Sequence, residues 1–513
     1  MADNLQIFKV YCEGGLDTNR DVLSQGEQQP GSATRLINYE PSITGGYRRI
    51  SGYTNSFPSL PGTGATLGVV VANGIDDGIF ACRAPTSGNN YLHAWNTSTE
   101  SWDTVTTSGS PTMSGVTKIR SVKYNWTEHR FMLVDGINPA AYYNGTSYVP
   151  VTHADAPSAP KYIADFASHM FLAGDSSAPT TVYFSAPLDE TDFSVANGAG
   201  AINVGFIVVQ LKKFRDELYI FGTNNIKKII GTSIADFSLV EVTNDLGCVA
   251  SDSIIEIGGD LLFMGPDGLR PISGTDRIGD VELETISKSI QSIIADVSIN
   301  QDLEGLNSVV IRQKSQFRIF FAASESTGII GALKQSSSGI GFEFGQLLGI
   351  TATCVDSGYI GQVEFVIHGD SDGKVHRQES GTSFDGTEIF SLFQTPYYHM
   401  GDPELRKNFL KISTYLRSEG TTNLAMGVVY DYEDEFVSNP TDFSLTTEGA
   451  AAFYNEAVFD AAGVIYDGNP SPVVKTNIAG SGTSISIKYV TNDTNASHSI
   501  QGLVLLFGLG DRR

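Results

Sequence analysis

The chain has 513 residues, more than one hydrophobic core usually holds, so we expect one large domain with one or two smaller additions. Hydrophobic residues make up 41% and charged residues 18%, which excludes general disorder and indicates a folded protein. Because 57 acidic residues stand against 33 basic ones, the formal net charge is −24, and such a surface should repel nucleic acid unless its cations gather in one place.

Residues 1–64 are expected to form an extended arm with short strands and no core of its own. Glycine, proline and asparagine recur from Gly14 to Gly64, and a short strand is predicted at Ile7–Tyr11. The arm should therefore be buried against the rest of the chain. The first residues lack the basic start and apolar stretch of a secretory signal, and no apolar run is long enough to cross a bilayer, so we expect no membrane anchor.

A β pattern starts near residue 65. Strands are predicted at Leu67–Val71, Gly78–Cys82 and Tyr91–Asn96, with the hairpin signal Asn73-Gly74 between the first two. Trp102 follows soon after. These segments are expected to form the first blade of a larger β domain.

Six short aromatic-aliphatic strands then recur, each running into a turn with glycine or asparagine. They are Arg130–Val134, His169–Ala173, Glu217–Phe221, Asp260–Met264, Gln316–Phe320 and Glu364–His368. The marker residues Phe131, Phe171, Leu218, Leu261, Phe317 and Phe365 are separated by 40, 47, 43, 56 and 48 residues. These steps are close to the roughly 40 to 50 residues of one propeller blade.

A four-stranded blade cannot bury its own faces, so it is stable only when stacked against neighbouring blades around an axis. We therefore predict an all-β protein in which residues 65–399 form a β-propeller of about five to eight blades. The marked strand of each blade should lie nearer the axis than the strand that follows it. A propeller of this kind would serve as a rigid scaffold.

One segment departs from the β pattern. Between Val281 and Val297 the apolar residues follow the i, i+3, i+4, i+7 spacing of an amphipathic helix. An inserted helix accounts for the 56-residue step between Leu261 and Phe317. Two interpretations stay open: the helix packs beside a blade, or it docks a partner subunit.

Residues 400–513 are expected to form a C-terminal β-sandwich-like domain, because evenly spaced short strands follow a boundary near Met400–Pro403. The strands are Lys411–Arg417, Leu424–Tyr432, Val464–Tyr466, Ser484–Tyr489 and Gln501–Leu505. The acidic run Asp431–Glu435 should be an exposed loop, with a cation site as the alternative.

The basic groups and the cysteines give little sign of a site. The basic groups are Lys212, Lys213 and Arg215; Lys227 and Lys228; and Arg48 and Arg49. None alternates with aromatic residues, so we interpret them as solvated turn residues.

The cysteines are Cys12, Cys82, Cys248 and Cys354. They are far apart and form no C-x-x-C pair, which predicts buried, unpaired thiols in a reducing compartment.

Most enzyme signatures are missing from the sequence, including the P-loop, H-E-x-x-H and G-x-S-x-G motifs. His368 and His376 are interpreted as ordinary strand and turn positions. Asp370–Gly373 starts like a calcium loop, but Gly381 stands where a glutamate is needed, so a turn is expected. We predict no enzyme, no catalytic residues, no cofactor and no metal. A carboxylate pair for glycoside hydrolysis stays open, because sequence gives no distance between acids.

Two sets of segments carry a family likeness. The first is Cys12–Asn19, Ala33–Pro41 and Gly45–Tyr53, and the second is Phe214–Thr223, Asp245–Ser253 and Gly258–Arg270. In this order they resemble the opening and the propeller core of the tail nozzle, or tail-hub (head-to-tail stabilisation), proteins of short-tailed bacteriophages. The likeness covers the arm and most of the predicted propeller, and it weakens past Met400.

The resemblance implies a structural virion protein of the phage tail. In that family six copies form a ring below the portal or head-to-tail adaptor and extend the DNA exit channel. The implied partners are further copies of the chain in a homohexamer, the adaptor or portal, tail fibre or other tail proteins, and genomic DNA that passes without specific binding. An acidic channel wall would let DNA pass, because like charge lowers adhesion. The implied location is the virion tail, after assembly in the host cytoplasm.

Two functions from other classes stay open. One is a propeller carbohydrate-binding or glycan-hydrolysing tail component, which glycan binding by the isolated protein would favour. The other is a non-viral propeller adaptor that recruits protein partners through its top face. A ring with an open lumen in electron microscopy would favour the nozzle over both.

Overall fold

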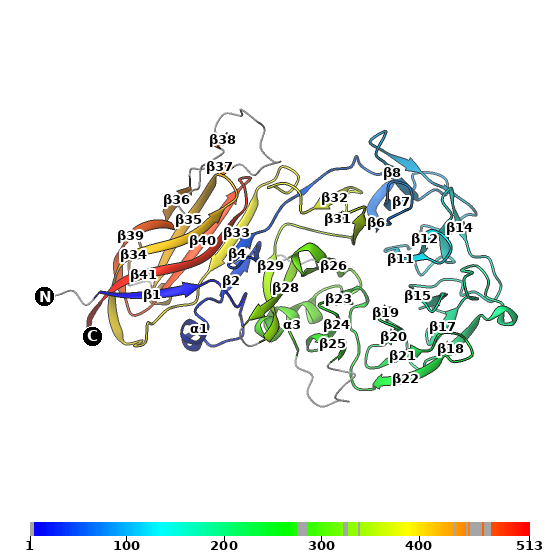
Figure 1. The fold of residues 1–513 in the computed structure, drawn as a ribbon, viewed down its shortest axis with the longest axis horizontal. Helices are drawn as coiled ribbons and strands as arrows, with labels where there is room; N and C mark the ends of the chain where they lie inside the picture. Colours follow the sequence, from blue (N-terminus) through cyan, green and yellow to red (C-terminus); the bar gives the residue numbers. More distant parts are fainter. Residues whose placement is uncertain are drawn as a thin grey trace.

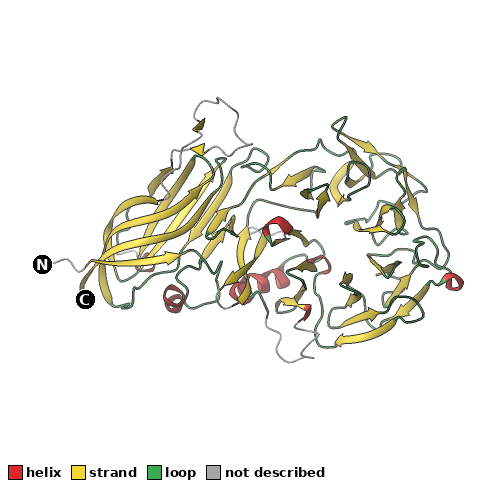
Figure 2. Cartoon of the chain, viewed as in Figure 1, coloured by secondary structure: helices red, strands yellow, loops and turns green. Residues whose placement is uncertain are grey.

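The computed structural model describes residues 5–273, 285–321, 327–336, 339–434, 437–447, 450–451, 464–465 and 473–512. Within them the protein is all-β, which confirms the predicted fold class (Figure 2). A ring of small sheets lies beside a sandwich of long strands, and both chain termini lie at the far end of the sandwich (Figure 1).

Seven blades in the described residues surround one axis and form a propeller (Figure 1). Six of them are separate small sheets, and blade 6 is part of a larger sheet. Blades 1 to 4 are antiparallel meanders of four strands. Their strands are β6 (Thr63–Val71), β7 (Ile79–Ala84), β8 (Leu92–Asn96) and β9 (Ser101–Thr104); β11 (Arg120–Asn125), β12 (His129–Val134), β13 (Ala141–Tyr143) and β14 (Ser147–Pro150); β15 (Tyr162–Phe166), β16 (His169–Ala173), β17 (Thr181–Phe184) and β18 (Gly200–Asn203); and β19 (Gln210–Phe214), β20 (Glu217–Phe221), β21 (Ile226–Ile230) and β22 (Ser238–Thr243). The short β10 (Thr106–Thr107) pairs parallel to β14 at the edge of blade 2.

Blades 5 to 7 continue the ring. Their strands are β23 (Ile255–Ile257), β24 (Asp260–Gly265) and β25 (Gly268–Pro271); β26 (Asn307–Ile311), β27 (Gln316–Phe320), β28 (Gly328–Ser336) and β29 (Gly339–Leu347); and β30 (Cys354–Ile360), β31 (Val363–Gly369) and β32 (Val375–Gln378). Blade 7 gains its fourth strand from the N-terminal arm, because β5 (Tyr53–Thr54) pairs antiparallel with β32. The arm therefore closes the ring beside blade 1.

The six marker residues occupy matching places in successive sheets. They lie in β12, β16, β20, β24, β27 and β31, the second strand of blades 2 to 7. Each marked strand lies nearer the axis than the strand that follows it, as predicted. One further strand in the blade, such as β11 in blade 2, lies closer still to the axis. In blade 1 the second strand is β7, which carries Phe80 in the same position.

Packing between blades explains why these strands are continuous apolar runs. In β16, Phe171 packs with Leu218 of blade 4, whereas Met170 packs with Met132 of blade 2. Each second strand lies between two neighbouring blades and has no polar face, as in other sheets that are covered on both sides. One hydrophobic cluster fills each of the seven junctions between blades in the described chain. Burial of a phenylalanine there contributes about 1.5–3 kcal/mol.

The predicted helix between Val281 and Val297 is present in its second half. Residues 274–284 lie outside the described chain, and α3 (Gln291–Asn300) follows the 3-10 turn η3 (Lys288–Ile290). Ile294 and Val297 are buried in the cluster that joins blades 5 and 6, so the helix packs beside the blades. The other short helical segments are α1 (Val22–Gln28), η1 (Val195–Asn197), η2 (Ser251–Ser253), η4 (Arg312–Lys314) and η5 (Asp431–Glu433). Among the described residues no helix has the length and apolar character that a membrane span requires.

The sandwich has two sheets. One contains β1 (Leu5–Tyr11), β3 (Tyr39–Pro41), β4 (Tyr47–Arg49), β34 (Leu405–Ser418), β39 (Val473–Gly482) and β41 (His498–Arg512). The other contains β2 (Arg35–Ile37), β33 (Ile389–Gln394), β35 (Thr422–Tyr430), β36 (Phe443–Thr447) and β40 (Ile485–Asp493). The short β37 (Ala450–Ala451) and β38 (Val464–Ile465) pair with each other.

The borders between the domains follow strand pairing more than chain order. β33 precedes residue 400 but pairs with β40 of the sandwich. The arm is divided: β1, β3 and β4 belong to the sandwich, β5 belongs to blade 7, and β2 pairs with both β29 of blade 6 and β33. Blade 6 and one sandwich sheet therefore form one continuous sheet of nine strands, which holds the two domains together.

Candidate functional site

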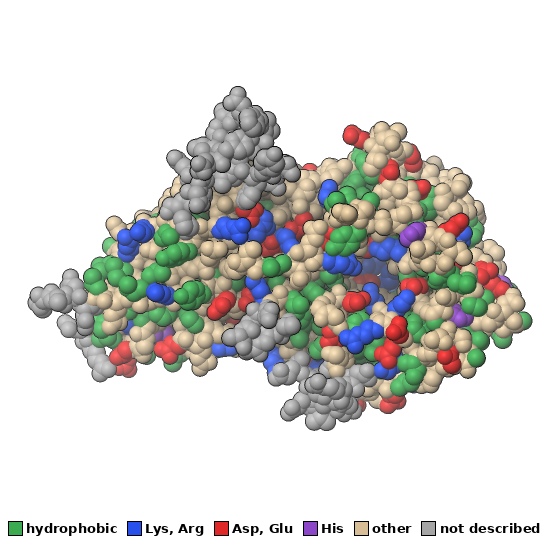
Figure 3. All heavy atoms as spheres, in the orientation of Figure 1, with side chains coloured by type: hydrophobic (Ala, Val, Ile, Leu, Met, Phe, Trp, Pro, Cys, Tyr) green, Lys and Arg blue, Asp and Glu red, His purple; other side chains and the backbone are tan. Residues whose placement is uncertain are grey.

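A cavity of about 410 Å³ lies on the propeller axis. Its wall takes residues from every blade, among them Val69, Val122, Ala164, Leu211, Ile254, Ser308 and Val355. Figure 3 shows the surface hollowed at the centre of the propeller, with basic and acidic side chains around the hollow. Because ligand sites are usually concave, the axis is the first place to look for chemistry.

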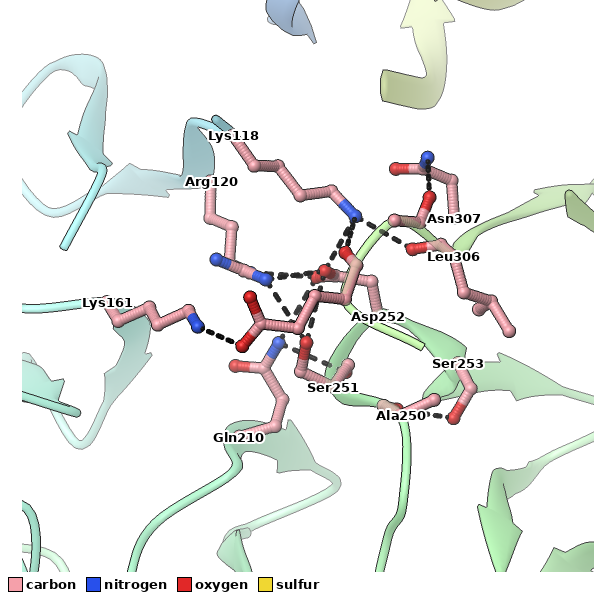
Figure 4. A network of polar contacts seen from close by, with 12 residues as sticks. Lys118, Arg120, Lys161, Gln210, Ala250, Ser251, Asp252, Ser253, Leu306 and Asn307 are labelled. Atoms are coloured by element: carbon pink, nitrogen blue, oxygen red, sulfur yellow. Dashed lines mark hydrogen bonds and ion pairs between the residues drawn. The ribbon is translucent and has the colours of Figure 1, made fainter. Parts of the chain in front are cut away.

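Asp252 is at the centre of an ion network across this cavity (Figure 4). Its Oδ2 lies 2.8 Å from Lys118 Nζ and 2.7 Å from Arg120 Nη2, and Arg120 Nε donates to its Oδ1 at 3.0 Å. Both cations come from the start of blade 2, whereas Asp252 directly precedes β23 of blade 5. The network therefore joins blades that are not neighbours.

Further hydrogen bonds bring blades 4 and 6 into the same network. Lys118 Nζ donates to the Leu306 carbonyl at 2.7 Å. Gln210 Nε2 donates to the Ser251 carbonyl at 3.2 Å, and Arg120 Nη2 donates to Ser251 Oγ at 3.1 Å (Figure 4). The charged groups at the centre are thus held on several sides.

Three more ion pairs surround the axis: Lys161–Glu304 at 2.7 Å, Lys213–Asp165 at 3.1 Å and Lys123–Asp356 at 2.8 Å. Lys212 lies on the same wall without an ion pair in the described part of the chain. Burial disfavours its charge more than Glu256 favours it, so its pKa is lowered. Lys212 and Lys213 are strand residues of β19 on the axis, so their interpretation as solvated turn residues is wrong, whereas Arg215 of the same group is an exposed turn residue, as predicted.

Electrostatics fixes the charge state of Asp252. Burial alone would raise its pKa, but Lys118 and Arg120 outweigh burial and lower the pKa to about 2. The pKa values of Asp252 and Lys118 are both lowered, which favours the charged form of Asp252 and disfavours that of Lys118, because Asp252 has two cations whereas Lys118 shares its carboxylate with Arg120. For Lys118 burial prevails and the pKa is lowered. The Asp252 carboxylate is therefore ionised at neutral pH, and its charge is balanced by the two cations.

Asp252 is unsuited to act as a general acid. A glycosidase needs one carboxylic acid whose pKa is raised so that it can donate a proton, and the shift at Asp252 has the opposite sign. Of the three other acids on the wall, Asp165 and Asp356 are each held by a lysine, and the third is Glu256. Sequence reasoning missed this network, because its members lie in the innermost strands and loops, which have no apolar pattern.

A second charged network is buried where the propeller meets the sandwich. Arg318 of β27 is 0% exposed, lies 3.5 Å from Glu40 and forms an ion pair with Glu379. Arg48 of β4 joins it through Glu40 at 3.2 Å and binds Glu419 at 2.6 Å. Burial opposes the charge of Glu379, but the surrounding cations, Arg318 first, lower its pKa to about 2. The network therefore ties the arm to both domains.

The interpretation of the remaining basic pairs as solvated turn residues is also wrong. Arg49 is buried in β4, and its Nη1 lies 2.8 Å from Asp493. Lys227 and Lys228 lie in β21, where Lys227 Nζ donates to a backbone carbonyl and Lys228 pairs with Glu217 at 3.0 Å. Their partners lie on other strands or loops, 11 to 444 residues away, so a local pattern could not reveal them.

The residues considered for metal binding make other contacts. His368 and His376 stack with their ring centroids 4.9 Å apart, and burial lowers the pKa of His368 to about 3. Asp370 accepts hydrogen bonds from His376 and from the Lys374 backbone, so this segment is the turn that was predicted. Within the described chain no group of three or more His, Cys, Asp or Glu residues is placed to hold a metal ion.

The acidic run after β35 is also used structurally. Asp431 accepts hydrogen bonds from the backbone of Thr483 at 2.7 Å and of Ser484 at 3.0 Å, and Glu433 pairs with Lys488 at 2.5 Å. Glu435 lies outside the described residues.

The four cysteines are buried and unpaired, as predicted. Burial raises the pKa of Cys248 to about 11 and of Cys354 to about 12, and it raises the pKa of the other two thiols as well. Protonated thiols are poor nucleophiles, so these cysteines are structural.

Comparison with known proteins gives distant structural neighbours. No protein-family model matches the chain, and no curated protein matches it. The extracellular domain of a hybrid two-component system from B. thetaiotaomicron is 10% identical, with a TM-score of 0.39 over 66% of this chain and 41% of that one. An ancestral GH74 enzyme is 9% identical, with a TM-score of 0.40 over 72% of this chain and 52% of that one. The chain thus spans about half or less of either neighbour, and neither likeness bears on function.

Proposed function

We propose that the protein is a structural component of a short-tailed bacteriophage tail, where copies form a ring below the portal–adaptor complex and extend the DNA exit channel. The support is the ordered resemblance of the arm and of blades 4 and 5 to tail nozzle proteins. The observation that supports a structural and not a catalytic role is the axial network, in which Asp252, Lys118 and Arg120 hold blades together. A propeller whose axial charges bind one another serves as a rigid body.

The axial cavity of one propeller is narrow and closed by charged side chains. The cavity measures about 410 Å³ and is crossed by ion pairs of 2.7–2.8 Å. Because these ion pairs join opposite sides of the axis, they leave no open passage for a duplex through one propeller. The genome would therefore pass through the lumen of a ring of several copies. The net charge of −24 suits that role, because an acidic protein does not retain a polyanion.

The arm gives the body the stiffness that a static ring part needs. The segments Ala33–Pro41 and Gly45–Tyr53, which carry part of the resemblance, contain β2, β3, β4 and the start of β5. These strands pair with blade 6, blade 7 and both sandwich sheets. Propeller and sandwich are thus joined by backbone hydrogen bonds as well as by side-chain packing.

Electron microscopy and mass measurement of the full-length protein test the proposal. Six copies of 55.0 kDa give particles of about 330 kDa, and we expect rings with an open lumen. The same preparation should not retain duplex DNA at about 0.15 M salt, where a basic protein of similar size would. Monomers at every concentration, or cleavage of a polysaccharide by the purified protein, would contradict the proposal.

A further inference from the structure

The outer face of the six-stranded sandwich sheet presents apolar side chains to solvent. On the edge strand β1 the outward residues Leu5, Ile7 and Tyr11 are exposed, Ile7 to 63% and Tyr11 to 68%. Figure 1 shows β1 beside β41 along the sandwich. Successive exposed apolar residues on an edge strand favour association, and natural proteins usually avoid them on a free surface.

The strand register extends this surface over four strands. Ile7 of β1, Leu506 of β41 and Lys411 of β34 are opposite one another, and residues that pair across strands share a face. In the next row Lys9 of β1 is opposite Val504 of β41. Each row thus combines apolar side chains with a lysine.

The same register adds β39 and a third row. Ser413 of β34 pairs with Lys475 of β39, in line with the row of Lys9. Tyr11 and Tyr415 are both opposite Gly502, one on either side of β41. We call this surface the outer sheet face and define it by Ile7, Lys9, Tyr11, Lys411, Tyr415 and Lys475. Figure 3 shows hydrophobic and basic side chains next to one another on the sandwich.

The charge of the outer sheet face is opposite to that of the molecule. Lys9, Lys411 and Lys475 make no ion pair within the described chain, and no acidic residue lies in the three rows. The whole protein carries a net charge of −24. A surface that covers this face should therefore be acidic as well as partly apolar, and a second copy of the chain meets the charge requirement, because the protein is strongly acidic as a whole.

The size of the face fits a protein contact. Seven residues of β1 at about 3.3 Å each, and four strands about 4.8 Å apart, give an area of roughly 450 Å². The largest patches on monomeric proteins have a similar area and are often functional. It supplies about half of the roughly 800 Å² that each partner buries in a standard interface, and Leu410 and Leu509, exposed at its edge, extend it. Its many aliphatic side chains disfavour DNA, whose protein interfaces are polar and strongly basic.

We propose that the outer sheet face binds an acidic, partly apolar surface elsewhere on a second copy of the chain, so that copies associate head to tail. A two-fold contact of this face with itself would bring the three unpaired lysines of one copy against those of the other, which is repulsive. A contact between different surfaces avoids this, and such contacts produce rings when the rotation closes. This face would be the contact between neighbouring copies in the proposed ring. The inference rests on the proposed function only for the closure of the ring.

Two substitutions and a matched control test the interface in the full-length protein. Ile7→Thr removes an apolar contact from the face and keeps a residue suited to a strand, and Lys411→Glu reverses a charge there. The control is Ile207→Thr on the propeller, because Ile207 is also exposed to 63%. Sedimentation velocity and mass photometry report self-association, and urea unfolding checks that each variant folds.

We expect each face variant to raise the concentration needed for half-association by at least about tenfold, since central contacts dominate an interface. The control should match the wild type. Raising salt from about 0.05 to 0.5 M should weaken the wild type more than Lys411→Glu. Equal ring formation by all four proteins would overturn this interface and leave the proposed ring standing. A wild type that stays monomeric up to about 50 µM would overturn both, and so would binding of a duplex DNA fragment that Lys411→Glu abolishes.

Discussion

Asp252→Asn removes the carboxylate that Lys118 and Arg120 share on the propeller axis. The two cations remain buried without their partner, and asparagine keeps the size of the side chain. Because the pKa of Asp252 falls from its ordinary 3.8 to about 2, its ionised form contributes about 2.5 kcal/mol at neutral pH, net of the cost of burial. Breaking a buried pair on one side typically costs about 3–5 kcal/mol, so we expect a loss of about 3 kcal/mol.

Tryptophan fluorescence during urea unfolding measures this loss in the propeller alone. The three tryptophans, Trp95, Trp102 and Trp126, all belong to blades 1 and 2, so the sandwich does not contribute to the signal. The free energy of unfolding follows from the urea midpoint and the slope of the transition. Glu304→Gln is the control, because Glu304 crosses the same axis but is largely exposed, and such pairs contribute less than about 1 kcal/mol.

The sign of the pH dependence gives a second check on Asp252. Its pKa is depressed in the folded protein, so its contribution is present above about pH 4 and is lost as the pH falls towards 2. Asp252→Asn should therefore differ most from the wild type at neutral pH and least near pH 2. The double variant with Lys118→Met should recover part of the loss, because it removes one unmatched cation. A single variant within about 0.5 kcal/mol of the wild type at pH 7 would refute the argument that these ion pairs hold the blades.

Three further expectations concern the body of the protein. Phe131→Ala at the junction of blades 1 and 2 should lower the free energy of unfolding by about 3–5 kcal/mol in the same assay, and an unchanged urea midpoint would contradict the blade packing. Burial holds the pKa of His368 at about 3 against 6.5 when unfolded, so stability should fall as the pH drops from about 6.5 towards 3; in His368→Gln this slope should be shallower. The four buried thiols should react with a disulfide reagent only after unfolding, and rapid reaction of Cys248 in the native protein at pH 8 would show that its site opens.

The sequence predicted the propeller because one strand in each blade is buried on both faces. Phe171 and Met170 face opposite neighbours, so their strand is apolar throughout and can be recognised without knowledge of its partners. The innermost strands were not predicted, for the opposite reason. Strands such as β11 and β19 carry charged residues toward the axis, and their alternation resembles that of an ordinary surface strand. The repeats therefore predicted the blades, whereas the axial network could be identified only in the three-dimensional structure.

Charged residues were the least predictable feature, because sheet register, more than proximity in sequence, decides which charges meet. Arg48 and Arg49 are adjacent in sequence, yet one binds Glu419 and the other Asp493, both more than 350 residues away. The outer sheet face shows the same principle: Lys9, Lys411 and Lys475 come from three strands. They lie on one surface because β1 and β34 pair with β41, and β39 pairs with β34. A local count of basic residues finds no cluster at any of the three. In an all-β chain of this length, a binding surface is a property of register, and only a pairing map that joins both ends of the chain can show it.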